Sequence, residues 1–569
     1  MSGSLTFVPS AAAAASAPPR RARPAARGPL PRILLCAAWI AGPGNWPLWR
    51  ALHGLPELHG AAALGFALAL GTAIAALLTA LLAALAWRRT LKPAIALLLV
   101  SAALGAHFTG SYGVVIDPTM MTNVLQTDAR EVRDLLGPGL LLSLIALAAV
   151  PMAGLLRGRV DYGRLPVRAL RNVLAVALAL ALLALLVLAS FRTLSVEMRN
   201  HKPLRYLVNP LAAYYSLGRV AFAGSAGESG PARAIGLQAR AAPLGAGARP
   251  PLLMIVIGET ARADHFALNG YPRPTTPRLA ALGVLSFREV SSCGTNTAAS
   301  LPCMLSPLGR ETYGRSDGHS ENLLDLLQRA GLAVLWIENQ AGCKAQCLRV
   351  PHVQAHEPAG SAGTPPEALC PGGECYDEAL LHGLDARLAA LDPARRARGV
   401  VLVLHQMGSH GPAYWRRSPP DAKPFGPECA SSALQDCPPE ALIDAYDNTI
   451  AYTDRVLARA IGWLSGQAGY DPALLYVSDH GESLGENRLY LHGLPYGLAP
   501  RAQKHVPLIY WQPAAGAGQP ERIDAGCLRQ RLDAPLSHDH LFHTVLGLLG
   551  VQAEEYRAAL DAFAPCARP

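Results

Sequence analysis

Long apolar runs fill the first third of the chain. Five segments rich in Leu, Ala and Val follow one another with short polar connections between them. A helix of ~20 apolar residues crosses the ~30 Å hydrocarbon core of a bilayer, and most of the runs approach that length. They span residues 30–52, 61–87, 92–109, 138–156 and 169–191. We therefore predict a five-helix transmembrane domain over residues 30–191.

The first run is the least regular of the five. Helix-breaking residues interrupt its second half, namely Gly42, Pro43, Gly44, Asn45 and Pro47. Such residues are tolerated in a spanning helix where neighbouring helices cover the backbone. A cleavable signal peptide is the alternative interpretation, and it is disfavoured because no clear small-residue cleavage site follows the run.

Beyond residue 250 the pattern changes to short apolar runs that end at polar residues. Runs of this kind span residues 252–257, 333–337, 400–404, 474–477 and 506–511. They are typical of buried parallel strands, and helical segments such as 321–330 and 445–464 lie between them. In such folds the functional site lies beyond the carboxyl ends of the strands. We predict a soluble α/β domain over residues 251–569.

Two segments of biased composition lie outside these domains. Residues 1–29 are rich in Ala, Pro and Arg, which predicts a disordered cytoplasmic tail. Residues 192–250 bridge the two domains. Within them, 196–222 carries tyrosines among apolar residues and suits a helix at the membrane interface, and an ordinary amphipathic linker helix fits equally well. The Gly-, Ala- and Ser-rich stretch 224–249 predicts a flexible tether.

The net charge of +9 is compatible with a nucleic acid or an anionic surface as partner. Basic residues gather beside the apolar runs rather than in one groove, which disfavours nucleic acid. They lie before the first run, between the second and third, and between the fourth and fifth. By the positive-inside rule these connections are cytoplasmic, so five spans place everything after residue 191 on the outer side of the membrane.

The cysteines agree with this topology. Of eleven, only Cys36 lies in the apolar part, and the other ten are an even number in a region assigned to an oxidising compartment. Local pairing suggests Cys293/Cys303, Cys343/Cys347, Cys370/Cys375 and Cys429/Cys437, with Cys527/Cys566 as a fifth pair. Zinc ribbons are disfavoured because the spacings do not repeat and no paired CxxC motifs occur. The sequence alone leaves the connectivity open.

Metal-binding residue types follow two of the predicted strands. Asp479 and His480 come directly after the run 474–477, and Glu259 follows the run 252–257. Carboxylates with an imidazole suit a divalent metal, zinc in particular. A turn with a surface histidine is the alternative, which the two independent strand ends make weaker.

A short loop bounded by Cys293 and Cys303 carries several hydroxyl residues. Thr295 and Thr297 both lie within it. A threonine hydroxyl is a poor nucleophile unless a base or a metal lowers its pKa. Taken alone, the loop is equally well a disulfide-closed turn without chemistry.

Four motifs in this order resemble the lipid A phosphoethanolamine transferases. They are MIVIGETARADHFALN (254–269), SCGTNTAASLPC (292–303), GSHGPAY (408–414) and VSDHGESLGENRLYLHG (477–493). That family includes the mobile colistin-resistance enzymes and belongs to the alkaline phosphatase/sulfatase superfamily. The resemblance covers residues 30–550. It implies a five-helix transmembrane domain plus an α/β alkaline-phosphatase/sulfatase-like soluble domain, in the bacterial inner membrane with the catalytic domain in the periplasm.

The resemblance implies a tightly bound Zn²⁺ held by Glu259, Thr297, Asp479 and His480, and it leaves the presence of a second zinc open. Thr297 would be the nucleophile, because the family's nucleophile follows the first cysteine of the loop by four residues, and Thr295 is its competitor. Two departures affect substrate fit rather than the ligands. Asn296 stands where the family commonly has Ala, and Glu338-Asn339 where it has Asp-Asn.

Further residues match the family's substrate contacts. His410 and His492 match histidines around the phosphate or a second zinc, with structural histidines as the alternative, and Lys344 matches a basic contact. Asn123, Thr127 and Glu131 match positions near the lipid head group. Their spacing of i, i+4 and i+8 predicts one face of a helix, and a solvated loop helix fits equally well.

The implied reaction moves phosphoethanolamine from phosphatidylethanolamine to a lipid A phosphate through a covalent phosphothreonine. This would modify lipopolysaccharide and reduce the binding of cationic peptides such as polymyxin. We expect a membrane-bound monomer without nucleic acid partners. Transfer to a core sugar is an alternative, as is a lipoteichoic-acid-synthase-like glycerophosphotransferase. A sulfatase is disfavoured because no Cys/Ser-x-Pro-x-Arg motif occurs, and a non-catalytic sensor because all four ligand positions are retained.

Overall fold

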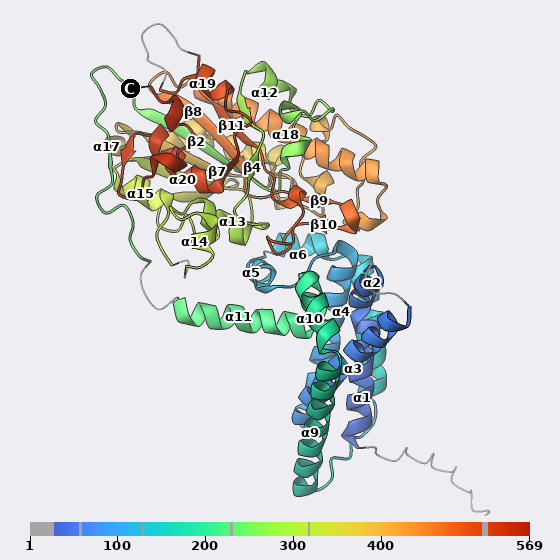
Figure 1. The fold of residues 1–569 in the computed structure, drawn as a ribbon. Coiled ribbons are helices and arrows are strands. Elements are labelled where there is room, and N and C mark those ends of the chain that lie inside the picture. Colours follow the sequence, from blue (N-terminus) through green and yellow to red (C-terminus); the bar gives the residue numbers. More distant parts are fainter. Residues whose placement is uncertain are drawn as a thin grey trace, which may run out of the picture.

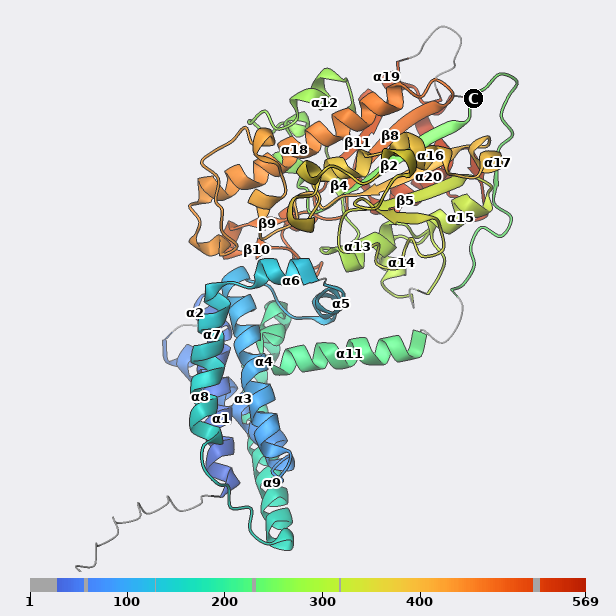
Figure 2. The same ribbon diagram turned by 180° about the vertical axis from the view of Figure 1, so that it is seen from behind.

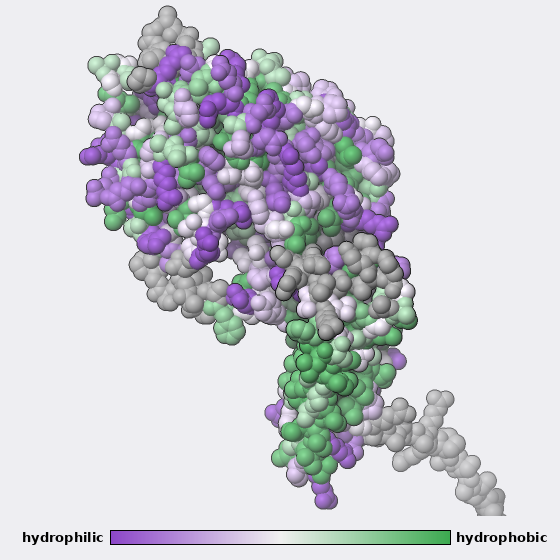
Figure 3. All heavy atoms as spheres, viewed as in Figure 1, coloured by the Kyte–Doolittle hydropathy of each residue, from purple (hydrophilic) through white to green (hydrophobic). Residues whose placement is uncertain are grey.

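A computed structural model describes residues 28–55, 60–127, 129–227, 232–316, 319–514 and 522–568. Within these ranges the chain forms a helical stalk below an α/β body (Figure 1). Apolar side chains gather on the surface of the stalk, whereas hydrophilic ones cover the body (Figure 3). The contrast is that of a membrane domain carrying a water-exposed domain. The predicted tail, residues 1–29, lies almost entirely outside the described residues.

Four helices of the stalk are long and apolar enough to cross a membrane. They are α3 (Gly60–Ala84), α4 (Leu91–Tyr112), the continuous helix Pro138–Leu156 formed by α7 (Pro138–Leu144), η2 (Ile145–Ala149) and α8 (Val150–Leu156), and α9 (Leu165–Ala189). The views in Figures 1 and 2 show them side by side as one bundle, with α3 against α9 and α4 against α7. Four of the five runs predicted to span a membrane therefore form helices of sufficient length.

The first predicted span differs from a single continuous helix. It consists of α1 (Pro29–Ala41), a 3₁₀ turn (Pro43–Asn45) and α2 (Trp46–His53). Pro43 has no backbone N–H to donate, so the helix ends at the break that Gly42 and Pro43 create. With 13 residues, α1 alone is shorter than the ~20 residues of a full crossing. It still packs in the bundle, where Arg32 Nε donates to the carbonyl of Leu155 at 3.0 Å.

A pair of asparagines fastens the linker to the stalk. Asn45 Nδ2 donates to the carbonyl of Asn209 at 2.7 Å, and Asn209 Nδ2 donates to the carbonyls of Gly44 and Ala102 at 2.8 and 2.6 Å. Polar groups within an apolar bundle are costly unless they are hydrogen-bonded. This network therefore favours a single arrangement of the linker against the stalk. Gly105 leaves the space that the Asn209 side chain occupies.

The linker is less uniform than its composition predicts. In place of one helix over 196–222 it forms α10 (Phe191–Asn200), a 3₁₀ segment (Lys202–Leu207) and α11 (Leu211–Gly227), with Pro203 and Pro210 at the breaks. In place of a tether throughout, Ile235 lies in the core of the body and β1 (Arg240–Ala241) pairs with β13 (Val551–Gln552). Gly236 has φ +61 and sits against Leu326, so glycine there permits close packing rather than flexibility.

The body is built on a seven-stranded sheet in the order β3-β11-β8-β2-β7-β5-β6. The strands are β2 (Pro251–Gly258), β3 (Leu285–Phe287), β5 (Ala333–Glu338), β6 (His352–Gln354), β7 (Val400–His405), β8 (Asp471–Ser478) and β11 (Leu508–Trp511). All five predicted strands are confirmed. β2, β5, β7 and β8 run parallel, as predicted. The prediction of a parallel strand is wrong for the last run, because β11 is antiparallel to both β8 and β3.

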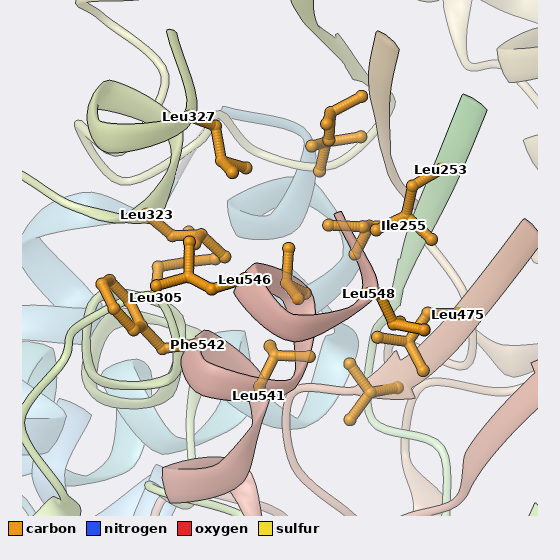
Figure 4. Close-up of a cluster of buried hydrophobic side chains, with 14 of the residues drawn as sticks. Leu253, Ile255, Leu305, Leu323, Leu327, Leu475, Leu541, Phe542, Leu546 and Leu548 are labelled. Atoms are coloured by element: carbon orange, nitrogen blue, oxygen red, sulfur yellow. The ribbon is translucent and has the colours of Figure 1, made fainter. Parts of the chain in front are cut away.

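Helices cover both faces of this sheet, which explains why its central strands are apolar throughout. On one face, α15 (Leu323–Arg329) and α20 (Leu541–Leu548) pack against β2 side chains such as Leu253 and Ile255 (Figure 4). On the other, α18 (Pro439–Ser465) covers Met254 and Val256. The two parallel neighbours of β2 are in register with its end, Gly258 pairing with Ser478 and Ile257 with His405. Residues after these three strands therefore converge.

All five predicted cysteine pairs are disulfides in the structure, each within the body. They are Cys293–Cys303, Cys343–Cys347, Cys370–Cys375, Cys429–Cys437 and Cys527–Cys566. The remaining cysteine, Cys36, is free and buried in α1. The pairing agrees with an oxidising compartment for the body.

Candidate active site

Three buried ligand groups meet where β2 and β8 end. Glu259, Asp479 and His480 are fully buried, and their donor atoms lie within 4.8 Å of one another. His480 Nε2 is 3.2 Å from Glu259 Oε1 and 3.4 Å from Asp479 Oδ2. Neighbouring parallel strands deliver these residues to one point, as the sequence predicts.

The donor atoms fit a divalent cation. His480 Nδ1 lies 2.9 Å from the carbonyl of Gly481, so Nδ1–H donates there and the Nε2 lone pair faces the carboxylates. Asp479 Oδ1 accepts from the backbone N–H of His480, while Asp479 Oδ2 and His480 Nε2 have no hydrogen-bond partner among the described residues. Buried polar atoms without hydrogen-bond partners are rare. Two such atoms close to the Glu259 carboxylate are typical of a metal site.

The electrostatics of the three groups are strongly coupled. Burial raises the pKa of Asp479 to about 6, and the charge of Glu259 adds to this shift. Burial acts to lower the pKa of His480, but Asp479 and Glu259 outweigh it and raise that pKa to about 10. Burial likewise opposes ionisation of Glu259, yet His480 lowers the pKa of this carboxyl overall. A proton on His480 and a divalent cation would therefore compete for the same carboxylates.

Thr297 is the first residue of α13 (Thr297–Met304) and reaches the same point. Its hydroxyl lies 3.0 Å from Glu259 Oε2 and 3.3 Å from Oε1 and is buried. The competing Thr295 instead donates its hydroxyl to the carbonyl of Leu494 at 2.6 Å. At a helix N-terminus, unpaired N–H groups and the helix dipole favour a negatively charged group, so a phosphoryl group on Thr297 would be well placed.

The two departures from the family pattern have structural reasons. Asn296 is the N-cap of α13, where its Oδ1 accepts from the N–H of Ala299 at 2.9 Å. Asparagine is preferred at N-caps over alanine by about 1 kcal/mol. Glu338 Oε2 accepts from Trp336 Nε1 at 2.8 Å and lies 3.0 Å from His405 Nδ1. Glu338 thus supports the strand ends beside the site.

Both predicted histidines lie beside the ligand cluster. The ring of His492 is 4.3 Å from that of His480 and 5.7 Å from that of His410, measured between centroids. His492 Nδ1 lies 3.3 Å from a carboxylate oxygen of the buried Glu482, which fixes the orientation of the ring. Two imidazoles next to a metal-binding group can donate or accept protons there.

Lys344 and two of the predicted head-group residues lie where the body meets the stalk. Lys344 Nζ donates to the carbonyl of Gln126 at 3.3 Å, at the end of α5 (Pro118–Gln126). Asn123 and Thr127 are partly buried, and Thr127 Oγ1 donates to the carbonyl of Asn123 at 2.9 Å.

The prediction of a single helix face for Asn123, Thr127 and Glu131 is wrong. The backbone becomes extended at Thr127, which caps α5, and a second helix, α6 (Ala129–Leu135), begins after it. A helical spacing of i, i+4 and i+8 holds only while one helix continues. The backbone of Glu131 lies in α6, and its side chain is outside what the structure describes.

Helix α5 forms the wall between the active site and the stalk. It packs against α13, which carries Thr297, and against α11. Met120 of α5 occupies the space where a side chain on Gly493, the residue after His492, would lie. Gly493 has φ +90, a conformation that favours glycine. The site is therefore assembled from both domains (Figure 2).

His538 is a site-supporting residue that the sequence analysis missed. Its Nδ1 accepts from the backbone N–H of Cys293 at 3.0 Å, and its Nε2–H donates to the carbonyl of Ser478 at 2.9 Å. It thus joins the nucleophile loop to the end of β8. The Ser-His-Asp-His sequence at 537–540 is the available signal, but its distance along the chain from both partners conceals the contact.

We predict that His538 makes the body sensitive to acid. Burial lowers its pKa to about 4, below the ~6.5 of an exposed histidine, because both nitrogens are satisfied only in the neutral form. The unfolded chain therefore binds the proton first, and stability falls as the pH drops from about 6.5 towards 4. The loss should reach about 2 kcal/mol between pH 7 and pH 5.

Thermal unfolding of the full chain in detergent at pH 7 and pH 5 checks this. In His538→Gln, which cannot take up the proton, the acid-induced drop in Tm should shrink. An equal drop in both proteins would contradict the role of His538.

Comparison with known proteins places these features in a family. The sulfatase family model matches residues 251–551, and the family model described as phosphoethanolamine transferase EptA/EptB matches residues 74–223. The phosphoethanolamine transferase EptA of Salmonella typhimurium is 41% identical over 499 residues, which cover 86% of this chain and 87% of that protein. The phosphatidylethanolamine transferase Mcr-1 of Escherichia coli is 38% identical, covering 84% and 87%.

Solved structures agree. The integral membrane lipooligosaccharide phosphoethanolamine transferase A of Neisseria meningitidis has a TM-score of 0.88 and 32% identity, covering 96% of this chain and 100% of that one. Its likeness extends over stalk and body together. The chain therefore belongs to the phosphoethanolamine transferases, membrane enzymes of the alkaline phosphatase/sulfatase superfamily.

Proposed function

We propose that this protein transfers phosphoethanolamine from phosphatidylethanolamine to a phosphate of lipid A, with Thr297 as the covalent nucleophile. The observation that carries the proposal is the Thr297 hydroxyl, 3.0 Å from Glu259 Oε2 and at the start of α13. A buried hydroxyl in this position is oriented and polarised before substrate arrives.

The reaction takes place in two balanced steps. The Thr297 hydroxyl gives up its proton, for which Glu259 is the acceptor at 3.0 Å. Its oxygen attacks the phosphorus of phosphatidylethanolamine, and the bond from phosphorus to the diacylglycerol oxygen breaks. Diacylglycerol leaves as its alcohol after taking up a proton, for which His410 and His492 are the candidate donors. A lipid A phosphate oxygen then attacks the same phosphorus, and the bond to Thr297 breaks and restores the hydroxyl.

We propose Zn²⁺ as the metal, held by Glu259, Asp479, His480 and the Thr297 oxygen, with one tightly bound ion. When bound, it lowers the pKa of the threonine hydroxyl and neutralises developing phosphoryl charge. The carboxylates keep the ion in place, and the bond from His480 Nδ1 to Gly481 keeps the ligating nitrogen aimed at it.

The remaining predicted residues would hold the donor head group. Lys344 is suited to a phosphate oxygen, and Asn123, Thr127 and Glu131 to the polar and cationic parts of ethanolamine. Lys344, Asn123 and Thr127 lie at the junction of α5 with the body, which supports this role, because a lipid in the outer surface of the membrane would reach the site past α5. Tethering the body to the membrane keeps both lipids at high effective concentration.

We further propose that the stalk lies in the bacterial inner membrane, that the body is periplasmic, and that the protein acts as a monomer. Adding phosphoethanolamine masks a lipid A phosphate with an amine, which weakens the attraction of cationic peptides such as polymyxin to the cell surface.

Mass spectrometry of lipid A tests the function. Cells expressing the protein should contain lipid A with an added phosphoethanolamine group, and cells with an empty vector should not. Modification on a core sugar alone would favour the alternative acceptor. An unchanged lipopolysaccharide in cells with confirmed expression would overturn the proposal.

A further inference from the structure

Two cationic side chains converge on one aromatic ring at the edge of the nucleophile loop. Arg310 Cζ is 4.1 Å and Lys504 Nζ is 5.1 Å from the centroid of the Tyr496 ring. Three separate segments supply them: Arg310 begins α14 (Arg310–Tyr313), Tyr496 follows His492 along the chain, and Lys504 ends a 3₁₀ turn. None of the three is used in the donor chemistry above.

This cluster is built onto the loop that carries Thr297. Tyr496 Oη donates to the carbonyl of Ser292 at 3.0 Å, and the N–H of Ser292 donates to the carbonyl of Lys504 at 2.8 Å. Lys504 Nζ donates to the carbonyl of Tyr496 at 3.2 Å. The positions of the two cations are therefore tied to the start of the nucleophile loop.

The positive charge of the cluster has little compensation from carboxylates. Lys504 forms no ion pair with any carboxylate in the part of the chain that the structure describes, and its pKa is lowered by burial and then by the charge of Arg310. Arg310 has one weak contact, 3.9 Å to the exposed Glu311. The nearby Asp539 accepts from the backbone N–H of Arg310 rather than from its guanidinium. Two like charges held together with little compensation favour an anion between them.

The cluster also faces the membrane side of the body. Figures 1 and 2 show α13 and α14 on the lower side of the body, above α11. Tyr215, Leu217 and Phe222 of α11 are exposed apolar residues, as in a helix that lies in a membrane interface. We expect an anion that reaches Arg310 and Lys504 from this side to belong to a lipid head group.

We propose that Arg310, Tyr496 and Lys504 form the subsite for a phosphate of the acceptor glycolipid, with the cations binding phosphate and the tyrosine packing against the attached sugar. This inference rests on the proposed function. The donor suits the cluster less well, because its amine would be repelled by the two cations. The acceptor carries phosphate without an amine and must approach after diacylglycerol has left.

Separate half-reactions of the purified full-length protein test the subsite. Arg310→Gln and Lys504→Gln should each raise the acceptor KM about tenfold, and the double variant about 100-fold, as expected for charge-assisted contacts. The rate of adduct formation from phosphatidylethanolamine alone should stay within about twofold. Arg310→Lys should recover most of the acceptor KM.

Arg501→Gln is the matched control. Arg501 lies three residues before Lys504 and pairs with the exposed Glu289 at 2.7 Å, so its loss removes the same charge without touching Tyr496. Its acceptor KM should match the wild type. Unchanged KM values in the double variant, or equal losses in both half-reactions, would overturn the subsite, provided that Tm and zinc content match the wild type.

A binding measurement separates this inference from the proposed function. In phosphatidylcholine nanodiscs, the Thr297→Ala protein should bind added lipid A about tenfold more tightly than the same protein with Arg310→Gln added. Added phosphatidylglycerol should show no such difference, and an equal difference would assign the cluster to any anionic lipid and refute the acceptor subsite. A wild type that forms no adduct would defeat the proposed function, while this binding comparison would still decide the subsite.

Discussion

Thr297→Ala should abolish both the phosphoethanolamine adduct and lipid A modification, with a loss of at least about a thousandfold in transfer rate. Removing the nucleophile from an enzyme with a covalent intermediate costs this much or more. Peptide mass spectrometry after incubation with phosphatidylethanolamine alone should find the adduct on the Thr297 peptide of the wild type. Stability should change by less than about 1 kcal/mol, because the residue is the first of its helix and its hydroxyl is not part of a core.

Thr295→Ala is the control for this variant. Its hydroxyl donates to Leu494 and does not face Glu259, so adduct formation should be retained. Thr297→Ser should keep a trace of activity, because it has the hydroxyl but lacks the methyl group that restricts the rotamer. An adduct on Thr295 would move the nucleophile, and full lipid A modification by Thr297→Ala would end the covalent mechanism.

Asp479→Asn should remove the metal while preserving the shape of the site. The substitution exchanges a ligand oxygen for an amide and takes away one of the two carboxylates that face His480 Nε2. Zinc content measured on the purified protein should fall well below that of the wild type, and the rate of adduct formation should fall at least about a hundredfold, since the threonine then stays protonated at neutral pH.

Thermal unfolding with and without a chelator provides an independent measurement. Chelation should lower the Tm of the wild type and leave that of Asp479→Asn unchanged, because only a folded state with a complete site gains stability from the metal. Asp471→Asn is the matched control at the other end of β8, where Asp471 pairs with Arg522 at 2.6 Å. Normal zinc content in Asp479→Asn would remove Asp479 from the ligand set.

The parts of the structure that follow from short-range patterns were predictable. Glu259 and Asp479 could be placed together because each directly follows an apolar run, and parallel strands end at one edge of a sheet. Cysteine pairs a few residues apart could likewise be matched, since a closed loop of that size leaves few other partners. The length of the apolar runs located four helices of the stalk.

The features that could not be predicted depend on contacts between residues far apart in the sequence or on breaks that the hydrophobic pattern does not show. His538 contacts Cys293 across 245 positions, and no local signal connects them. The stretch around Gly236 is flexible by composition, yet it packs against Leu326. The break at Thr127 is a third case, because the hydrophobic pattern does not distinguish one helix from two short ones with an extended residue between them.

The contact of Met120 with Gly493 brings the stalk to the active site, and the two domains contribute different parts of that site. The body alone supplies every proposed metal ligand and the nucleophile, whereas α5, which belongs to the stalk, supplies the wall beside His492. We therefore expect substitutions along α5 to alter which donor lipids enter without disturbing the catalytic groups. Within such a scaffold, donor range and chemistry are free to diverge at different rates, one through the stalk and the other through the body.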